Sequence, residues 1–132
     1  MTAHHLDTAH KAIKTVADLL GHIEDIKELG ITRSEFIVKD GTMVYYDAHG
    51  LRARSRSMYE PLLIADLSSS AQLETAISLH TSGQADFPAF CWLTARAGVE
   101  NWVIDINSQV YIYYDQAGTK MLTEPITQFN YA

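Results

Sequence analysis

Three arginines alternate with small residues in one short stretch of the chain. Arg52, Arg54 and Arg56 are separated by Ala53 and Ser55. On an extended segment alternate side chains point the same way, so the three guanidinium groups would line one side. Such a row is able to bind a phosphate, a carboxylate or an acidic partner. The structural alternative is a charged edge strand that prevents unwanted pairing with other chains.

Histidine and cysteine are the other side chains that could support chemistry. The six histidines show neither the i, i+4 spacing of a helical zinc site nor an HExxH or CxxC motif, so we expect no metal site. Cys91 stands among Phe90, Trp92 and Leu93, whereas a reactive thiol needs cationic neighbours or a helix N-terminus. We therefore expect Cys91 to pack in the core. The sequence also has no phosphate-binding glycine loop and no nucleophile elbow, so we predict no catalytic residue and no cofactor.

The composition is that of one soluble domain. The chain has 132 residues, 47% of them hydrophobic, and no apolar run approaches the roughly 18 residues needed to cross a bilayer. Its 16 acidic and 10 basic residues give a net charge of -6, which disfavours nucleic-acid binding through phosphate contacts. The single cysteine excludes an internal disulfide. We expect one cytoplasmic domain, residues 1–132, that binds neither nucleic acid nor membranes.

The sequence resembles itself at an offset of 68 residues. Residues 30–50 align with residues 98–118 without a gap, and the aligned pairs include identical glycines at both ends and the tripeptide Tyr-Tyr-Asp. The apolar positions of the two segments also correspond. Because the period is longer than that of solenoid repeats, we interpret the pattern as two half-domains, residues 1–66 and 67–132, that share one core.

Each half begins with two predicted helices. Apolar residues recur every three or four positions within residues 6–29 of the first half and within residues 73–97 of the second. Glycines follow the helical segments, serines precede the third helix, and Asp86 with Pro88 is typical of a helix N-terminus. These signals predict an ααβββ order if strands follow.

A hairpin and then a third strand are predicted after the helices of each half. Asp40-Gly41 is a strong two-residue turn signal, and pairing across it places Phe36 opposite Tyr45. The corresponding turn at residues 107–109 is less diagnostic and leaves the register of the second hairpin open by a residue or two. The third strands are expected at residues 59–65 and 121–127.

The repeated Tyr-Tyr-Asp has a structural explanation, because adjacent residues on a strand point to opposite faces. Tyr45 and Tyr113 are predicted to face the core, and the aspartate of each copy ends the strand and begins a turn. The second tyrosine of each copy then lies on the other face together with an aliphatic residue, and such a partly apolar face needs a cover. We therefore expect a low-polarity interface made by Val44, Tyr46, Ile112 and Tyr114.

The segment DFPAFCWLTARAGVENWVIDINSQVYIYYDQAG resembles the YbcV-like proteins of bacteria and prophages, a domain of unknown function of which some members are labelled phage envelope protein. The matching elements are Asp86-Phe87-Pro88, Ala97-Gly98-Val99, the alternating strand up to Asp105, and Tyr113-Tyr114. The order of elements in the first half fits as well, although that half is longer after Gly50. The resemblance implies a bacterial or prophage origin and carries over no catalytic residue.

Together these patterns predict an α+β fold of two duplicated ααβββ halves with pseudo-twofold symmetry, in which helices pack on one face of an antiparallel sheet. The function we expect is that of a non-enzymatic binding or accessory protein that acts through a protein–protein surface, as a homodimer or with another protein. The alternative is a small anionic-ligand-binding protein or an enzyme with a pocket at the junction of the two halves, in which Arg52, Arg54 or Arg56 holds the anion.

Overall fold

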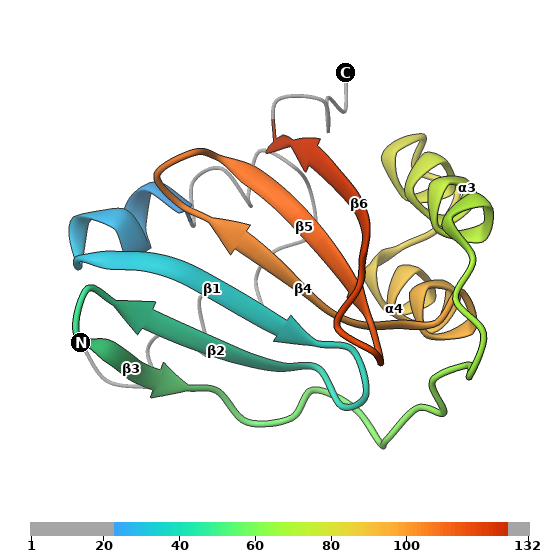
Figure 1. Ribbon diagram of the computed structural model, residues 1–132, viewed down its shortest axis with the longest axis horizontal. Coiled ribbons are helices and arrows are strands. Elements are labelled where there is room, and N and C mark those ends of the chain that lie inside the picture. Colours follow the sequence, from blue (N-terminus) through green and yellow to red (C-terminus); the bar gives the residue numbers. More distant parts are fainter. Residues whose placement is uncertain (1–22, 127–132) are drawn as a thin grey trace.

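The computed structural model describes residues 23–126, which form an antiparallel sheet with helices against it (Figure 1). Within these residues the sheet has six strands in the order β3-β2-β1-β4-β5-β6, and every neighbouring pair runs antiparallel. The strands are β1 (Ile31–Ile37), β2 (Thr42–Asp47), β3 (Gly50–Arg54), β4 (Val99–Asp105), β5 (Val110–Asp115) and β6 (Lys120–Pro125). The predicted α+β class and antiparallel sheet are confirmed.

Side-chain caps begin the two helices α3 (Ser70–Thr81) and α4 (Phe87–Arg96). The Ser69 hydroxyl accepts a hydrogen bond from the Gln72 amide at 3.2 Å, and the Asp86 carboxylate accepts one from the Ala89 amide at 2.9 Å. Both caps satisfy backbone donors that the first turn of a helix leaves free, and both agree with the sequence prediction. Residues 23–28 are also helical, whereas the helix predicted from residue 6 lies largely outside the described residues.

Strands β1 and β4 pair at the middle of the sheet and so join the two hairpins. Their ladder extends beyond both strands. The Val38 amide donates to the Glu100 carbonyl at 3.1 Å, and the Ile106 amide donates to the Thr32 carbonyl at 3.0 Å. Hydrogen bonds at both ends leave little freedom for the two hairpins to slide against each other.

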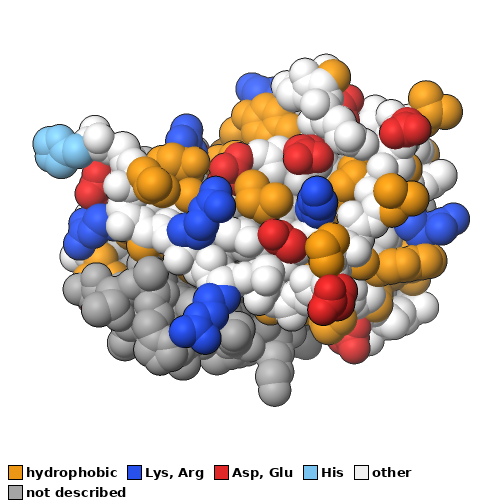
Figure 2. Space-filling model, turned by 90° about the horizontal axis from the view of Figure 1, so that it is seen from below, with side chains coloured by type: hydrophobic (Ala, Val, Ile, Leu, Met, Phe, Trp, Pro, Cys, Tyr) orange, Lys and Arg blue, Asp and Glu red, His pale blue; other side chains and the backbone are white. Residues whose placement is uncertain are grey.

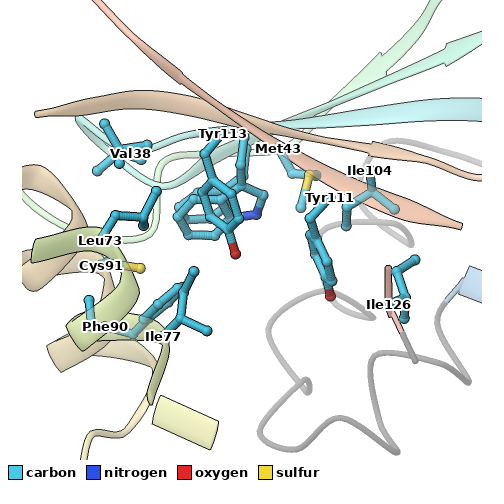
Figure 3. Packing of buried hydrophobic residues seen from close by; sticks show 14 of the residues in the cluster. Val38, Met43, Leu73, Ile77, Phe90, Cys91, Ile104, Tyr111, Tyr113 and Ile126 are labelled. Atoms are coloured by element: carbon cyan, nitrogen blue, oxygen red, sulfur yellow. The ribbon is translucent and has the colours of Figure 1, made fainter. Parts of the chain in front are cut away.

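The buried face of the sheet carries the aromatic core. Phe36 of β1 stacks on Trp102 of β4 with ring centroids 4.4 Å apart, so side chains as well as backbone join the central strands. Tyr45 and Tyr113 are 0% and 1% exposed, which confirms that the first tyrosine of each Tyr-Tyr-Asp faces the core. Figure 3 shows the helical side chains that point toward this face, Leu73 and Ile77 from α3 and Phe90 and Cys91 from α4.

The first hairpin turns at the predicted place but in a different register. Ser34 lies opposite Tyr45, where Phe36 was expected. Residues 38–41 all belong to the turn, which the Gly41 amide closes on the carbonyl of the last β1 residue at 2.9 Å. The turn is therefore longer than the predicted two residues, and the pairing of β1 with β2 is shifted by two residues from the predicted register. Because side chains alternate between the faces, a shift of two leaves every side chain on its predicted face.

The predicted third strand at residues 59–65 is wrong. The chain reverses directly after β2, because the Asp47 carboxylate accepts the His49 amide at 2.8 Å and Gly50 adopts a φ of 122° that favours glycine. Residues 50–54, with the first two alternating arginines, therefore pair with β2 as β3. In the second half β6 forms close to the predicted residues 121–127.

Residues 55–69 form a long connection from β3 to α3, which we call the strap. Its path runs from the sheet edge to the helices (Figure 1). Its backbone is bonded to the fold at several points: the Met58 amide donates to Asp40, the Leu62 amide to Lys39, the Ala65 amide to Ala95 and the Ser69 amide to Ala97, at 2.7–2.9 Å. The segment taken for a strand is thus extended and ordered but lies outside the sheet.

Alanine at Gly98 tests how closely the strap packs. Gly98 has a φ of +88°, and a Cβ there would lie 2.7 Å from the Ser68 Cα and 2.9 Å from the Leu67 carbonyl oxygen. Gly30 has a φ of +83° and open space around it, so Gly30→Ala is a matched control. Both variants carry the left-handed backbone penalty of about 1–2 kcal/mol. We expect urea unfolding to show that Gly98→Ala loses about 1–3 kcal/mol more. Equal losses would contradict a close-packed strap.

Candidate functional site

The outer face of the sheet, opposite the core, is the surface that the sequence predicted as an interface. Strand pairing places one row of outer-face side chains across the six described strands. The row consists of Arg54, Val44, Glu35, Val103, Ile112 and Thr123. Tyr46 and Tyr114 lie in the two flanking rows, opposite Arg33 and Asn101. The structure therefore brings the four predicted interface residues to one face.

The four predicted interface residues differ in exposure. Val44 is 2% exposed even on the outer face, so it supports its neighbours and has almost no surface for a partner. Tyr46, Ile112 and Tyr114 keep part of their surface accessible. Neither α3 nor α4 covers this face (Figure 1). A partner on the outer face would therefore contact the two tyrosines and Ile112.

A small polar network holds the centre of the outer face. The Arg33 guanidinium carbon lies 4.1 Å from the centroid of the Tyr46 ring, a cation–π contact. The Tyr46 hydroxyl donates to one Glu35 carboxylate oxygen at 3.4 Å, and the Asn101 amide donates to the other. Asn101 was not anticipated, because its partner lies 66 positions away and only the β1–β4 pairing brings the two together.

The structure does not place the three predicted arginines in one row. Arg52 donates to the Asp47 carboxylate at 3.3 Å and to the Leu29 carbonyl at 3.4 Å. Arg54 stands opposite Val44 on the outer face, and Arg56 is exposed beyond the end of β3. A β-bulge in β3, where Arg52 is the extra residue opposite the two tyrosines of β2, interrupts the alternation that a row would need.

Asp47 lies next to the arginine segment and pairs with Arg52. This pairing was not predicted from the sequence. The pKa of Asp47 lies below its usual value, first because the His49 amide bonds the carboxylate and also because Arg52 does. The contact is exposed, so it contributes little to stability. The pairing reduces the free positive charge of the segment to that of Arg54 and Arg56, among the residues that the structure describes.

A polar hollow of about 520 Å³ lies where the turns after β2 and β4 meet at one end of the outer face. Arg33 and His49 contribute to its lining, but Asp47 and Asp105 do too, and the arginines of β3 and the strap do not. Two carboxylates beside one arginine make a poor site for an anion. The predicted pocket at the junction of the halves thus has a geometric counterpart whose charge does not suit a small anionic ligand.

Burial shifts the pKa values of three titratable groups in or beside the core, Cys91, Tyr59 and His80. Cys91 is 1% exposed, and burial raises the pKa of its thiol to about 12. Burial, followed by Cys91 itself, raises the pKa of Tyr59, whose hydroxyl donates to the Val38 carbonyl. His80 has a lowered pKa, again through burial, and stacks on Phe90 at 4.6 Å. The core role predicted for Cys91 is confirmed.

Within residues 23–126 the structure contains neither a metal-ligand cluster nor a membrane-spanning helix. These residues contain no cluster of three or more histidine, cysteine or acidic side chains that could hold a metal ion. None of their helices combines the length and the apolar character that a bilayer-spanning helix requires.

Thiol labelling tests the burial of Cys91. With a pKa of about 12, roughly one thiol in ten thousand is ionised at pH 8, and only the thiolate reacts with a disulfide reagent. We expect native protein to remain unlabelled for hours and to react fully within minutes in strong denaturant. Rapid stoichiometric labelling of the native protein, with the circular dichroism spectrum unchanged, would contradict the buried position.

A triple substitution tests the arginine segment. If exposed charge at Arg52, Arg54 and Arg56 attracts an acidic partner, serine at all three positions should abolish retention on an anionic matrix at low salt, while the free energy of unfolding changes by less than about 1 kcal/mol. Arg52→Ser alone should have a small effect, because Arg52 is paired with Asp47. Equal, salt-insensitive retention of the wild type and the triple variant would remove these arginines from any binding role.

Comparison with known proteins places the chain in a family. A family model described as "Protein of unknown function (DUF1398)" matches residues 7–125. No curated protein matches the chain. Because the family match covers all six strands and both capped helices, the protein belongs to the DUF1398 family.

Proposed function

We propose that this protein is a non-enzymatic binding or accessory protein that acts through the outer face of its sheet. The observation that carries the proposal is a six-stranded sheet whose two faces differ. One face packs against the helices, and on the other the Arg33–Tyr46–Glu35–Asn101 network fixes the positions of the side chains. Satisfied polar groups and partly exposed tyrosines on a rigid surface are typical of protein interfaces. Burial shifts the pKa values of Tyr59, His80 and Cys91, which lie in or beside the core and away from this face.

A second copy of the chain is the partner that fits this face best. Strand spacing and rise give the face about 24 Å by 20 Å, so two copies would bury about 1,000 Å² in total, near the lower limit for a specific interface. The face carries Arg33 and Arg54 as well as Glu35 and Asp105. Because both signs are present, a copy turned about a twofold axis can place opposite charges against each other.

We also infer that the two halves arose by duplication. β-Bulges occur at Ile31–Arg33 and at Val99–Asn101, and again at Tyr45–Tyr46 and at Tyr113–Tyr114. The members of each pair are 68 residues apart, the offset at which the sequence repeats. Bulges are position-specific features, so two at the same offset support a common origin of the halves.

The centre of the sheet supports pseudo-twofold symmetry. Glu35 and Val103, which are 68 residues apart, lie directly opposite each other, as residues on a twofold axis must. Gln109 adopts a φ of 55° at the position that corresponds to Gly41, which has a φ of 75°. A non-glycine residue in this conformation is uncommon, so the second turn reproduces the first despite a different residue type.

The finer family and location assignments are part of the same proposal. A YbcV-like, phage-related origin rests on the motif around Asp86 and Gly98 within the family match. A cytoplasmic location rests on the composition and on the single cysteine. A small anionic ligand remains the weaker alternative, because the hollow beside Arg33 contains two carboxylates.

Sedimentation tests the dimer. At tens of micromolar we expect wild-type protein to sediment at twice the chain mass of 14.8 kDa. Glutamate at Val103 and Ile112, in the middle of the outer face, should shift it to a monomer because four unpaired charges would be buried in the interface. Leu63→Glu, on the strap, is the matched control and should stay dimeric. A monomeric wild type, or dimers of the double variant with an intact fold, would refute an interface on this face.

A further inference from the structure

The strap carries a second surface that the outer face does not explain. Leu63 and Leu67 are 92% and 85% exposed, and Trp92 on α4 is 50% exposed. Figure 2, which looks onto β3 and the strap, shows apolar side chains standing out from the surface at the end nearer the helices. Large apolar side chains that gather on a surface mark an interaction site more often than an isolated exposed leucine does.

The exposed leucines are held in place by the fold. The Leu62 amide donates to the Lys39 carbonyl at 2.7 Å, and the Ala65 amide donates to the Ala95 carbonyl at 2.9 Å. The Gln116 side chain also donates to the carbonyls of residues 64 and 65, at 3.3 and 3.1 Å. With the backbone bonded on both sides of Leu63, its side chain projects into solvent in an ordered segment. Preorganised side chains of this kind lose little conformational freedom on binding.

A hollow of about 270 Å³ lies between the strap and α4. Its lining consists of Leu62, Leu63, Ala65, Trp92, Ala95 and Arg96. At about 30 Å³ for each water molecule, the space is that of about nine waters, enough for one large apolar side chain. Five of the six lining residues are apolar, and Arg96 and backbone atoms add polar surface, so the hollow suits an apolar side chain with a polar group beside it.

Arg96 gives the hollow a positive edge. Its guanidinium carbon lies 4.9 Å from the centroid of the Trp92 ring, which fixes the charge beside the apolar space. Among the acidic side chains that the structure describes, none lies within salt-bridge distance of Arg96. In a chain of net charge -6 this arrangement selects a partner that brings its own carboxylate.

We propose that the strap and α4 form a docking site for a segment of another protein with apolar side chains and an Asp or Glu next to them. One apolar side chain enters the hollow, the carboxylate pairs with Arg96, and Leu63 and Leu67, at most about 14 Å apart along the strap, cover the flanking apolar side chains. A second copy fits less well, since a twofold contact here brings the two Arg96–Trp92 pairs together. This site lies apart from the outer face, so a dimer would carry two of them.

Peptide selection tests the site without a known partner. A display library of random peptides is selected on immobilised wild-type protein and counter-selected on a Leu63→Ser, Trp92→Ser variant. We expect enriched peptides to combine two large apolar residues with an Asp or Glu, and the double variant to bind them at least tenfold more weakly. Arg96→Gln should weaken binding about fivefold and only for peptides that keep the carboxylate. Val103→Glu with Ile112→Glu should bind them like the wild type.

Three outcomes would overturn the proposal. The first is no enrichment on the wild type, and the second is enrichment of peptides that bind the double variant equally. The third is loss of the dimer in Leu63→Ser, Trp92→Ser protein, which would assign the surface to a second copy. Far-UV circular dichroism of each variant checks the fold. Because dimerisation is measured separately by sedimentation, either of the first two outcomes leaves the outer-face proposal standing, whereas the third would contradict both proposals.

Discussion

The antiparallel pairing of β1 with β4 is the interaction on which the rest of the structure depends. It joins two three-stranded antiparallel units, β1–β3 and β4–β6, into one six-stranded sheet. The same pairing places Phe36 against Trp102 in the core and brings Glu35 to Asn101 on the outer face. If the pairing slipped by one residue, both faces would exchange their side chains, and the core and the polar network would be lost together.

The two faces of the sheet carry different kinds of side chain. The inner face takes the first tyrosine of each repeat and the apolar residues of α3 and α4, and burial of these side chains supplies the main driving force for folding. The outer face keeps charged groups and the second tyrosine of each repeat, and Tyr46 is fixed there by cation–π and hydrogen-bond contacts with Arg33 and Glu35. A surface built in this way is ordered before a partner arrives, which favours binding.

The strap accounts for the main asymmetry between the halves. After Gly50 the first half needs a path from the sheet edge to α3, whereas the second half ends its strands at β6. The additional residues are bonded to the β1–β2 turn and to the end of α4. They present leucines to solvent at a place where the second half has no counterpart among the described residues. The strap thus adds a surface that the proposed duplication of the halves does not account for.

The features that follow from local periodicity could be predicted from the sequence. Alternation along the strands gave the correct faces of Tyr45, Tyr46, Tyr113 and Tyr114, and cap residues gave the start of α4. The hairpin register was missed by two, because Asp40-Gly41 signals a turn without fixing its length. The third strand was misplaced, because apolar residues 59–65 read as a strand while β3 depends on the conformation of Gly50.

The candidate sites were harder to predict than the fold, because they depend on contacts between distant residues. The Glu35–Asn101 contact requires the β1–β4 register, and the exposure of Leu63 requires hydrogen bonds from the strap to two separate elements. The Arg52–Asp47 contact spans five positions across the predicted turn and was within reach, had the next strand been placed at residues 50–54. Local patterns identify which residues share a face but not which distant groups meet there.

Nuclear Overhauser contacts across β1 and β4 test the central pairing most directly. The Val38–Glu100 and Ile106–Thr32 hydrogen bonds imply that Ile37–Asn101, Glu35–Val103 and Arg33–Asp105 are the close, non-hydrogen-bonded pairs, with Cα atoms about 4.5 Å apart. The account predicts strong Hα–Hα cross-peaks for these three pairs within one chain. Cross-peaks that join Glu35 to a different β4 residue, or β1–β4 cross-peaks that are absent while both hairpins keep theirs, would contradict it.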